Sequence, residues 1–107
     1  MRGYIDLIIL RVLCDGDSYG YEISKRVSEM SQGSYAMKET TLYSAFARLE
    51  KMGCLRSYPG VYSGGRTRTY YALTEAGWQH YRHKCDEWMA TKNLISKFIK
   101  ENNDGSN

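Results

Sequence analysis

The sequence predicts a mainly helical α+β protein, with a mixed unit over residues 1–73 and a long helix plus polar tail over residues 74–107. Three observations predict this class. Apolar residues recur at helical spacing in three early segments. Two β-rich runs flank a glycine-rich loop after residue 54. A helical pattern then returns for the last third of the chain. A core of this size is marginal alone, so we expect a partner subunit to add to its stability.

Two helices are expected before residue 34. Residues 4–14 read as a buried helix that the Asp15-Gly16-Asp17 turn ends. Ser18 is expected to cap a second helix, with Glu22 near its positive end. This helix should end near Gln32-Gly33 and bury one face, composed of Ile23, Val27 and Met30.

A third helix shows the clearest pattern in the chain. Apolar residues at spacings of three and four form one stripe, made of Leu42, Ala45, Phe46, Leu49 and Met52. Polar and basic residues fall on the opposite face, namely Thr41, Ser44, Arg48 and Lys51. Gly53 is placed where a helix commonly stops.

A hairpin and a last helix follow. Residues 55–58 and 67–73 are expected as strands, with Pro59-Gly60 and residues 63–65 in the loop between them. Thr74 is expected to cap a helix that runs to about Lys100, leaving residues 102–107 as a frayed tail.

The last helix would project from the domain. It would be about 40 Å long at ~1.5 Å per residue, whereas a compact domain of ~100 residues has a radius of gyration of only ~13 Å. A heptad seam runs along it, formed by Trp78, Tyr81, Cys85, Trp88, Lys92, Ile95 and Ile99. The seam predicts a homodimer through Trp78, Tyr81, Cys85, Trp88, Ile95 and Ile99. The alternative is that the helix folds back on its own domain.

The positive charge is concentrated in one segment. The whole chain has a formal net charge of +3, while residues 38–68 contain six basic and two acidic side chains. The entire excess therefore lies in that segment, as expected of a phosphate-binding surface.

These elements predict a winged helix-turn-helix. The second and third helices form the helix-turn-helix, whose second helix can enter a major groove. Its candidate donors to bases or phosphates are Lys38, Thr40, Thr41, Ser44 and Arg48. The hairpin tip, residues 63–68, is the expected wing, where Arg66 and Arg68 would neutralise phosphates. A two-fold dimer should recognise double-stranded DNA as an inverted repeat with half-sites about one helical turn, ~34 Å, apart.

Several motifs carry a family resemblance across nearly the whole chain. They are Tyr19-Gly20-Tyr21-Glu22-Ile23, Thr41-Leu42-Tyr43, Arg48-Leu49-Glu50-Lys51-Met52-Gly53, Gly64-Gly65-Arg66 and Tyr70-Tyr71-Ala72-Leu73-Thr74-Glu75-Ala76-Gly77. In this order and spacing they resemble the PadR family of transcriptional regulators, and the single long last helix resembles its short, LmrR-like subgroup. The resemblance implies a dimeric repressor released by a small molecule or stress signal. It also places Tyr43 on the recognition helix and Tyr19 at the phosphate-facing start of the second helix.

The resemblance further implies an effector pocket at the dimer centre. Trp88 matches the tryptophan that lines an aromatic drug-binding pore in the subgroup. The other candidate lining residues are Leu7, Leu10, Arg11, Cys85 and Lys92. Cys85 stands where the subgroup offers an aromatic residue and Lys92 where it offers an acid, so cationic drugs should be favoured less. A planar aromatic effector is expected, and a repressor that senses no ligand is the alternative.

Other classes are disfavoured by composition and spacing. The apolar run over residues 5–13 contains Asp6 and Arg11 and is too short to span a bilayer. Three widely separated cysteines, Cys14, Cys54 and Cys85, fit neither a disulfide framework nor a zinc site and suit a reducing cytoplasm. Two histidines without catalytic or metal-binding companions predict no enzyme, no metal and no cofactor. A winged-helix module that binds proteins instead of DNA is the alternative function.

Overall fold

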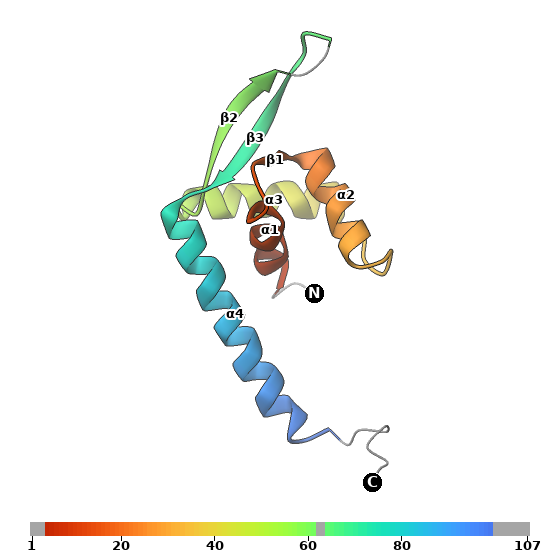
Figure 1. Cartoon of the computed structure of the whole chain (residues 1–107), viewed down its shortest axis with the longest axis vertical. Coiled ribbons are helices and arrows are strands. Elements are labelled where there is room, and N and C mark those ends of the chain that lie inside the picture. The colour runs from red at the N-terminus through yellow and green to blue at the C-terminus, as the bar shows by residue number, and fades with distance from the viewer. Residues whose placement is uncertain (1–3, 62–63, 100–107) are drawn as a thin grey trace.

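The structure is a computed structural model that describes residues 4–61 and 64–99. The described residues form helices and one three-stranded antiparallel sheet (Figure 1). In chain order the elements are α1 (Ile5–Leu13), β1 (Ser18–Tyr19), α2 (Gly20–Met30), α3 (Glu39–Lys51), β2 (Leu55–Val61), β3 (Thr67–Leu73) and α4 (Glu75–Ser96). This confirms the predicted class, a mainly helical α+β fold with a long last helix.

The core lies between the first three helices and the base of the sheet. Phe46 is its centre, 1 % exposed, and its ring stacks on Tyr71 of β3 with centroids 3.9 Å apart. The predicted stripe of α3 is confirmed for its members inside the helix, which are Leu42, Ala45, Phe46 and Leu49. Met52 is half exposed, so its placement in the core was wrong. The chain turns away there because Gly53, with φ +80°, ends the helix and lets the Cys54 amide donate to the Leu49 carbonyl at 2.9 Å.

The start of the second helix differs from the prediction. Ser18 belongs to β1, where it pairs with Tyr71, and α2 begins only at Gly20. The Ser18 hydroxyl donates to the Glu22 carboxylate rather than capping the helix. Sheet pairing with β3 fixes Ser18 in an extended conformation, and this tertiary contact overrides the local capping preference. Met30, the last predicted core residue of this helix, is 48 % exposed because it lies in the final turn.

The hairpin is longer than predicted. Pro59 and Gly60 lie inside β2, opposite Thr69 and Arg68 of β3, instead of in the loop. β2 is an edge strand, where a proline is tolerated. Gly60 is needed there, since a Cβ atom would lie 2.4 Å from the Tyr70 ring. β3 spans the predicted residues, and Ser63 of the wing falls outside the described residues.

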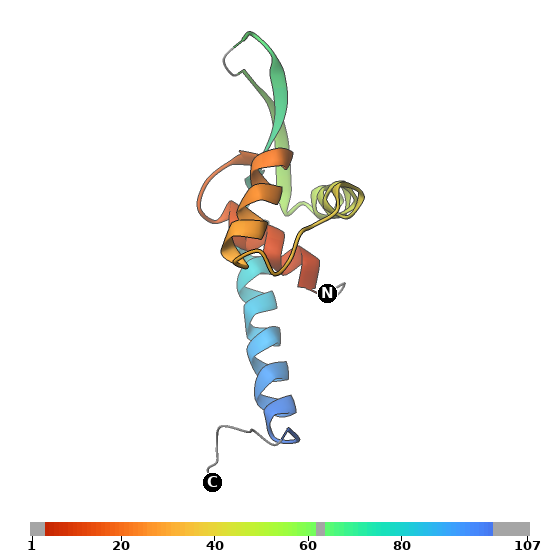
Figure 2. The same cartoon turned by 90° about the vertical axis from the view of Figure 1, so that its right-hand side faces the viewer.

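The last helix leaves the domain as an arm (Figures 1 and 2). Thr74 caps it as predicted, because its hydroxyl oxygen accepts a hydrogen bond from the Gly77 amide at 3.0 Å. The first half of α4 packs along α1, whereas every side chain from Asp86 to Ile99 is exposed. The chain extends 61 × 28 × 22 Å as a result. The helix ends at Ser96, short of the predicted end near Lys100, and residues 100–107 lie outside the described residues.

No helix in the described part of the chain combines the length and the apolar character that a membrane crossing needs.

Candidate nucleic-acid interface

The third helix presents a polar face at the margin of the molecule. Figure 2 looks almost along α3 (yellow) and shows it beside the rest of the domain, below the hairpin. Lys38, Thr40, Tyr43 and Ser44 are exposed on its first two turns, and Thr41 is half-buried. The buried stripe holds the opposite side of the helix in the core, so these side chains face outward on a fixed support.

Arg48, also predicted to contact DNA, is already engaged within the protein. Its guanidinium donates to both carboxylate oxygens of Asp6 in α1, with Nε 3.4 Å from Oδ2. The hydrogen bond that Arg48 donates to this carboxylate raises the pKa of Arg48 above its ordinary value. Asp6 therefore neutralises Arg48, and the ion pair connects α3 to α1.

Tyr43 is held between two helices. Its ring packs edge-on against Phe46, with centroids 5.4 Å apart. Its hydroxyl approaches the first residue of α2 so closely that a Cβ atom on Gly20 would lie 2.3 Å away. Tyr43 can occupy this position because glycine at residue 20 has no side chain. The family motif around Tyr19-Gly20 carries this requirement, although the helical spacing alone does not reveal it.

The wing and the helix-turn-helix meet around a shallow cavity. Arg66 is exposed at the hairpin tip, while Arg68 in β3 is half-buried with its guanidinium carbon 3.9 Å from the centre of the Tyr19 ring. A cavity of about 300 Å³ opens beside this contact and is lined by Tyr19, Gly20, Tyr21, Tyr43, Arg68, Thr69 and Tyr71. The structure therefore brings together three of the predicted DNA-binding residues, Tyr19, Tyr43 and Arg68. Tyr21 and Tyr70 were missed as contributors to this surface, although both stand in the motifs quoted above.

The predicted dimerisation residues separate into two groups. Trp78, Trp88, Ile95 and Ile99 are exposed. Tyr81 and Cys85 are half-buried and help to line an apolar cavity of about 390 Å³ against α1 and α2. The first half of the seam thus packs partly against its own domain, which agrees with the alternative that the helix folds back on that domain. In the second half, the Trp88 ring meets Tyr4 edge-on, while Ile95 and Ile99 are exposed.

The predicted effector residues do not converge on one site in the single chain. Leu7 and Trp88 line a cavity of about 490 Å³ together with Tyr4, whose ring is 5.4 Å from that of Trp88. Leu7 also lines the neighbouring apolar cavity, together with Arg11 and Cys85. Leu10 is fully buried in the core, and Lys92 is exposed on α4 without lining either cavity. Leu7 is therefore the predicted lining residue that the two cavities share.

The cysteines remain separate thiols among the described residues. Cys54 is buried, and this burial raises the pKa of its thiol; Cys14 and Cys85 are half-buried. Within residues 4–61 and 64–99 no three metal-ligating side chains come together.

Comparison with known proteins places these features in a family. Residues 9–83 match the transcriptional regulator PadR-like family. A transcriptional regulator from Clostridium thermocellum is 55 % identical, over 92 % of this chain and 93 % of that chain, with a TM-score of 0.86. A PadR family transcription regulator from Clostridium difficile is 37 % identical, over 91 % and 99 % of the two chains, with a TM-score of 0.79.

A third similar structure was solved in complex with DNA. It is Bacillus subtilis PadR in complex with operator DNA, 21 % identical over 87 % of this chain and 59 % of that chain, with a TM-score of 0.67. At that identity the likeness shows the fold alone. The family match covers more than half of the sequence and the architecture agrees throughout, so the chain belongs to the PadR-like family of transcriptional regulators and has its winged helix-turn-helix fold.

Proposed function

We propose that this protein is a homodimeric, sequence-specific DNA-binding regulator of the short, LmrR-like subgroup, which represses transcription until a small molecule or stress signal releases it. The observation that carries the proposal is the exposed polar face at the start of α3, formed by Lys38, Thr40, Tyr43 and Ser44, where Tyr43 lines a cavity together with Arg68 of the wing. Side chains of these types reach base edges in a major groove and phosphates beside it. The operator-bound Bacillus subtilis relative has the same fold and supports this arrangement.

The homodimer is supported by the second half of α4. Large apolar side chains are exposed on this half and on the residues just after it, namely Trp88, Met89, Leu94, Ile95, Phe98 and Ile99. Such a concentration on one arm is typical of an interface. A second copy offers the same arm, and a two-fold arrangement would present two α3 helices to one face of a duplex.

The DNA-binding test measures affinity against salt. A duplex selected from a random library of about 30 base pairs is titrated with protein, and log K is plotted against log salt concentration. Removing one phosphate contact should flatten the slope by about 0.9, so Arg66→Ala together with Arg68→Ala should flatten it by nearly 2. Arg82→Ala, which removes an exposed charge from α4, is the matched control and should leave the slope unchanged.

Two results would contradict the proposal for DNA. An unchanged slope in the double variant would show that the wing touches no phosphate. Failure of the wild-type protein to bind duplex at low salt would favour the alternative of a winged-helix module for protein partners. Thr41 and Ser44 are expected to act differently from the arginines, since their replacement should alter the preferred sequence.

The dimer test compares two substitutions on the same arm. Ile95→Glu places a charge on the exposed apolar face, whereas Asn93→Glu lies about 200° around the helix from it. Sedimentation of the wild-type protein should give twice the chain mass of 12.3 kDa. Ile95→Glu should shift the protein towards monomer, and Asn93→Glu should not. A wild-type monomer at micromolar concentration would exclude the dimer.

Signal sensing is proposed at the cavity beside Trp88. Aromatic walls can sandwich a planar ligand, with stacking worth about 0.5–1.5 kcal/mol beyond the area that is buried. A ligand there can release DNA only if it prefers one separation of the two recognition helices over another. The fluorescence of Trp88, measured on a Trp78→Phe background, should respond to planar aromatic compounds. A panel that changes neither this fluorescence nor the DNA affinity would favour a repressor without an effector.

A further inference from the structure

The two arginines of the wing have different surroundings. Arg66 is exposed before the start of β3. Arg68 lies in β3, and its guanidinium carbon is 3.9 Å from the ring centre of Tyr19. Tyr19 belongs to β1, immediately before α2, so this contact joins the hairpin to the helix-turn-helix.

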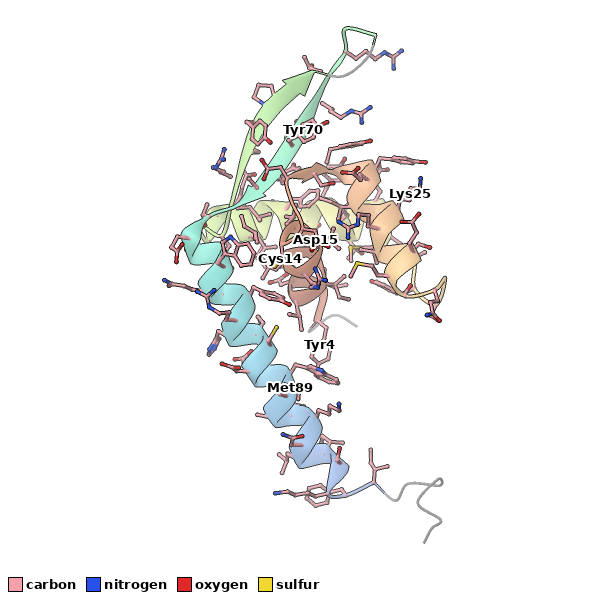
Figure 3. All side chains as sticks on the ribbon, viewed as in Figure 1. Tyr4, Cys14, Asp15, Lys25, Tyr70 and Met89 are labelled. Atoms are coloured by element: carbon pink, nitrogen blue, oxygen red, sulfur yellow. The ribbon has the colours of Figure 1, made fainter. Side chains whose placement is uncertain are left out.

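The ring of Tyr19 is itself held by other aromatic rings. Tyr70 meets it edge-on at 5.4 Å, and Tyr58 stacks on Tyr70 at 5.7 Å with the planes 17° apart. The hydroxyl of Tyr58 donates to the carboxylate of Asp17 at 2.5 Å, in the turn that precedes β1. Figure 3 shows Tyr70 between the hairpin and the helical domain. These contacts leave the Tyr19 ring little freedom to move away from Arg68.

The hairpin has a glycine where the ring of Tyr70 approaches its backbone. Gly60 lies opposite Arg68 in the β2–β3 pairing, and a Cβ atom there would meet the Tyr70 ring at 2.4 Å. Tyr70 can therefore occupy this position only because residue 60 has no side chain.

A stacked guanidinium remains able to bind phosphate. The N–H groups of a guanidinium lie in its plane and point outward from its edges, so a ring stacked on one face does not itself block them. Arg–phosphate pairs are frequently bidentate, which requires a defined orientation of the guanidinium plane. Ordering the side chain before binding reduces the conformational entropy lost on binding.

We propose that Tyr19 is a positioning residue that orients Arg68 in advance, which makes Arg68, rather than the more exposed Arg66, the principal phosphate-binding group of the wing. This role rests on the proposed function as a DNA-binding protein. The cavity beside Arg68, lined also by Tyr21 and Tyr43, is the space into which a backbone phosphate would enter. The flat ring of Tyr19 is the required feature, and its hydroxyl is not.

The test is a double-mutant cycle on duplex affinity. Tyr19→Phe keeps the ring and should bind within about twofold of wild type, whereas Tyr19→Leu should bind about fivefold to tenfold more weakly. On an Arg68→Ala background, Tyr19→Leu should have almost no further effect, because the side chain that it positions is gone. Arg68→Lys should lose affinity as Tyr19→Leu does, since an ammonium group cannot replace a stacked, bidentate guanidinium. Arg66→Ala should weaken binding less than Arg68→Ala.

A second measurement follows Arg68 without DNA. In the free protein the side-chain protons of Arg68 should show ring-current shifts in wild type and Tyr19→Phe that are lost in Tyr19→Leu. Additive effects of Tyr19→Leu and Arg68→Ala, or equal affinity of the Phe and Leu variants, would overturn the positioning role while leaving DNA binding intact. Absence of duplex binding by the wild-type protein would overturn the proposed function and this role together. Circular dichroism confirms that each variant is folded.

Discussion

For the substitution Gly77→Ala, helix propensity and tertiary packing predict changes in stability of opposite sign. Gly77 lies in the first turn of α4 and is buried. By helix propensity alone, Gly77→Ala should stabilise the protein by up to about 1 kcal/mol. In the structure, however, a Cβ atom at this position would lie 2.1 Å from the carbonyl oxygen of Cys54 and 3.1 Å from Leu73 Cδ2.

The clash involves backbone that has little freedom to relax. The same Cys54 carbonyl accepts a hydrogen bond from the Thr74 amide at 3.1 Å, and the Thr74 hydroxyl donates to the Gly53 carbonyl at 2.6 Å. Overpacking of this kind costs about 1–3 kcal/mol, and loss of the Thr74 cap costs about 1 kcal/mol more. After the gain in propensity is subtracted, Gly77→Ala should destabilise the protein by about 2 kcal/mol.

Urea unfolding followed by circular dichroism measures this effect. With m near 1–2 kcal/mol/M, the midpoint should fall by about 1 M or more. All variants are compared at one protein concentration, because unfolding of the proposed dimer would depend on concentration. Ala76→Gly, at the exposed neighbouring position, is the control and should lose no more than about 1 kcal/mol through propensity. A midpoint for Gly77→Ala at or above that of wild type would refute the reasoning.

Three further predictions concern other contacts. A double-mutant cycle between Asp6→Asn and Arg48→Gln should give a coupling of about 0.5–1 kcal/mol that decreases with salt, and no coupling would show that the ion pair is unimportant in solution. A hydrogen bond from Arg26 lowers the pKa of Asp15 below its ordinary value of about 3.9, so the stability this pair contributes is present above about pH 4 and is lost as the pH falls through the lowered pKa. Arg26→Ala should raise the Asp15 pKa measured by NMR, and an unchanged value would contradict the contact. Cys54, buried at 3 % exposure, should be alkylated by iodoacetamide only upon unfolding, and rapid modification of the native protein, detected by mass spectrometry, would contradict its burial.

The parts of the fold that depend on residues close together in the sequence could be predicted from the sequence. The apolar spacing of α3, the β-rich run of β3 and the cap at Thr74 are each determined within a few residues, and the structure confirms them. The predictions that failed depended on distant partners. Serine is a residue type that favours helix caps, but Ser18 lies in the sheet because it pairs with Tyr71. Proline is a residue type that favours turns, but Pro59 lies in a strand because β3 extends far enough for Thr69 to pair with it.

The candidate site shows the same division. The types of residue expected on the recognition helix and wing could be read from spacing, charge and motif. Their partners could not, since the carboxylate that engages Arg48 is 42 positions away in the chain and the ring that supports Arg68 belongs to another element. The residues predicted to line a cavity with Trp88 are also separated, because Leu10 is used in the core and Lys92 lies exposed on α4.

The proline in β2 has a consequence for solubility. A long hairpin that protrudes from a small domain offers a free strand edge, which in general can template aggregation between copies. Pro59 supplies no N–H group, and prolines occur in sheets chiefly where the missing donor falls on the free edge. Arg56 adds an exposed charge to the same strand. The hairpin can therefore extend beyond the helical part of the molecule with a strand edge that is poorly suited to pairing with another copy.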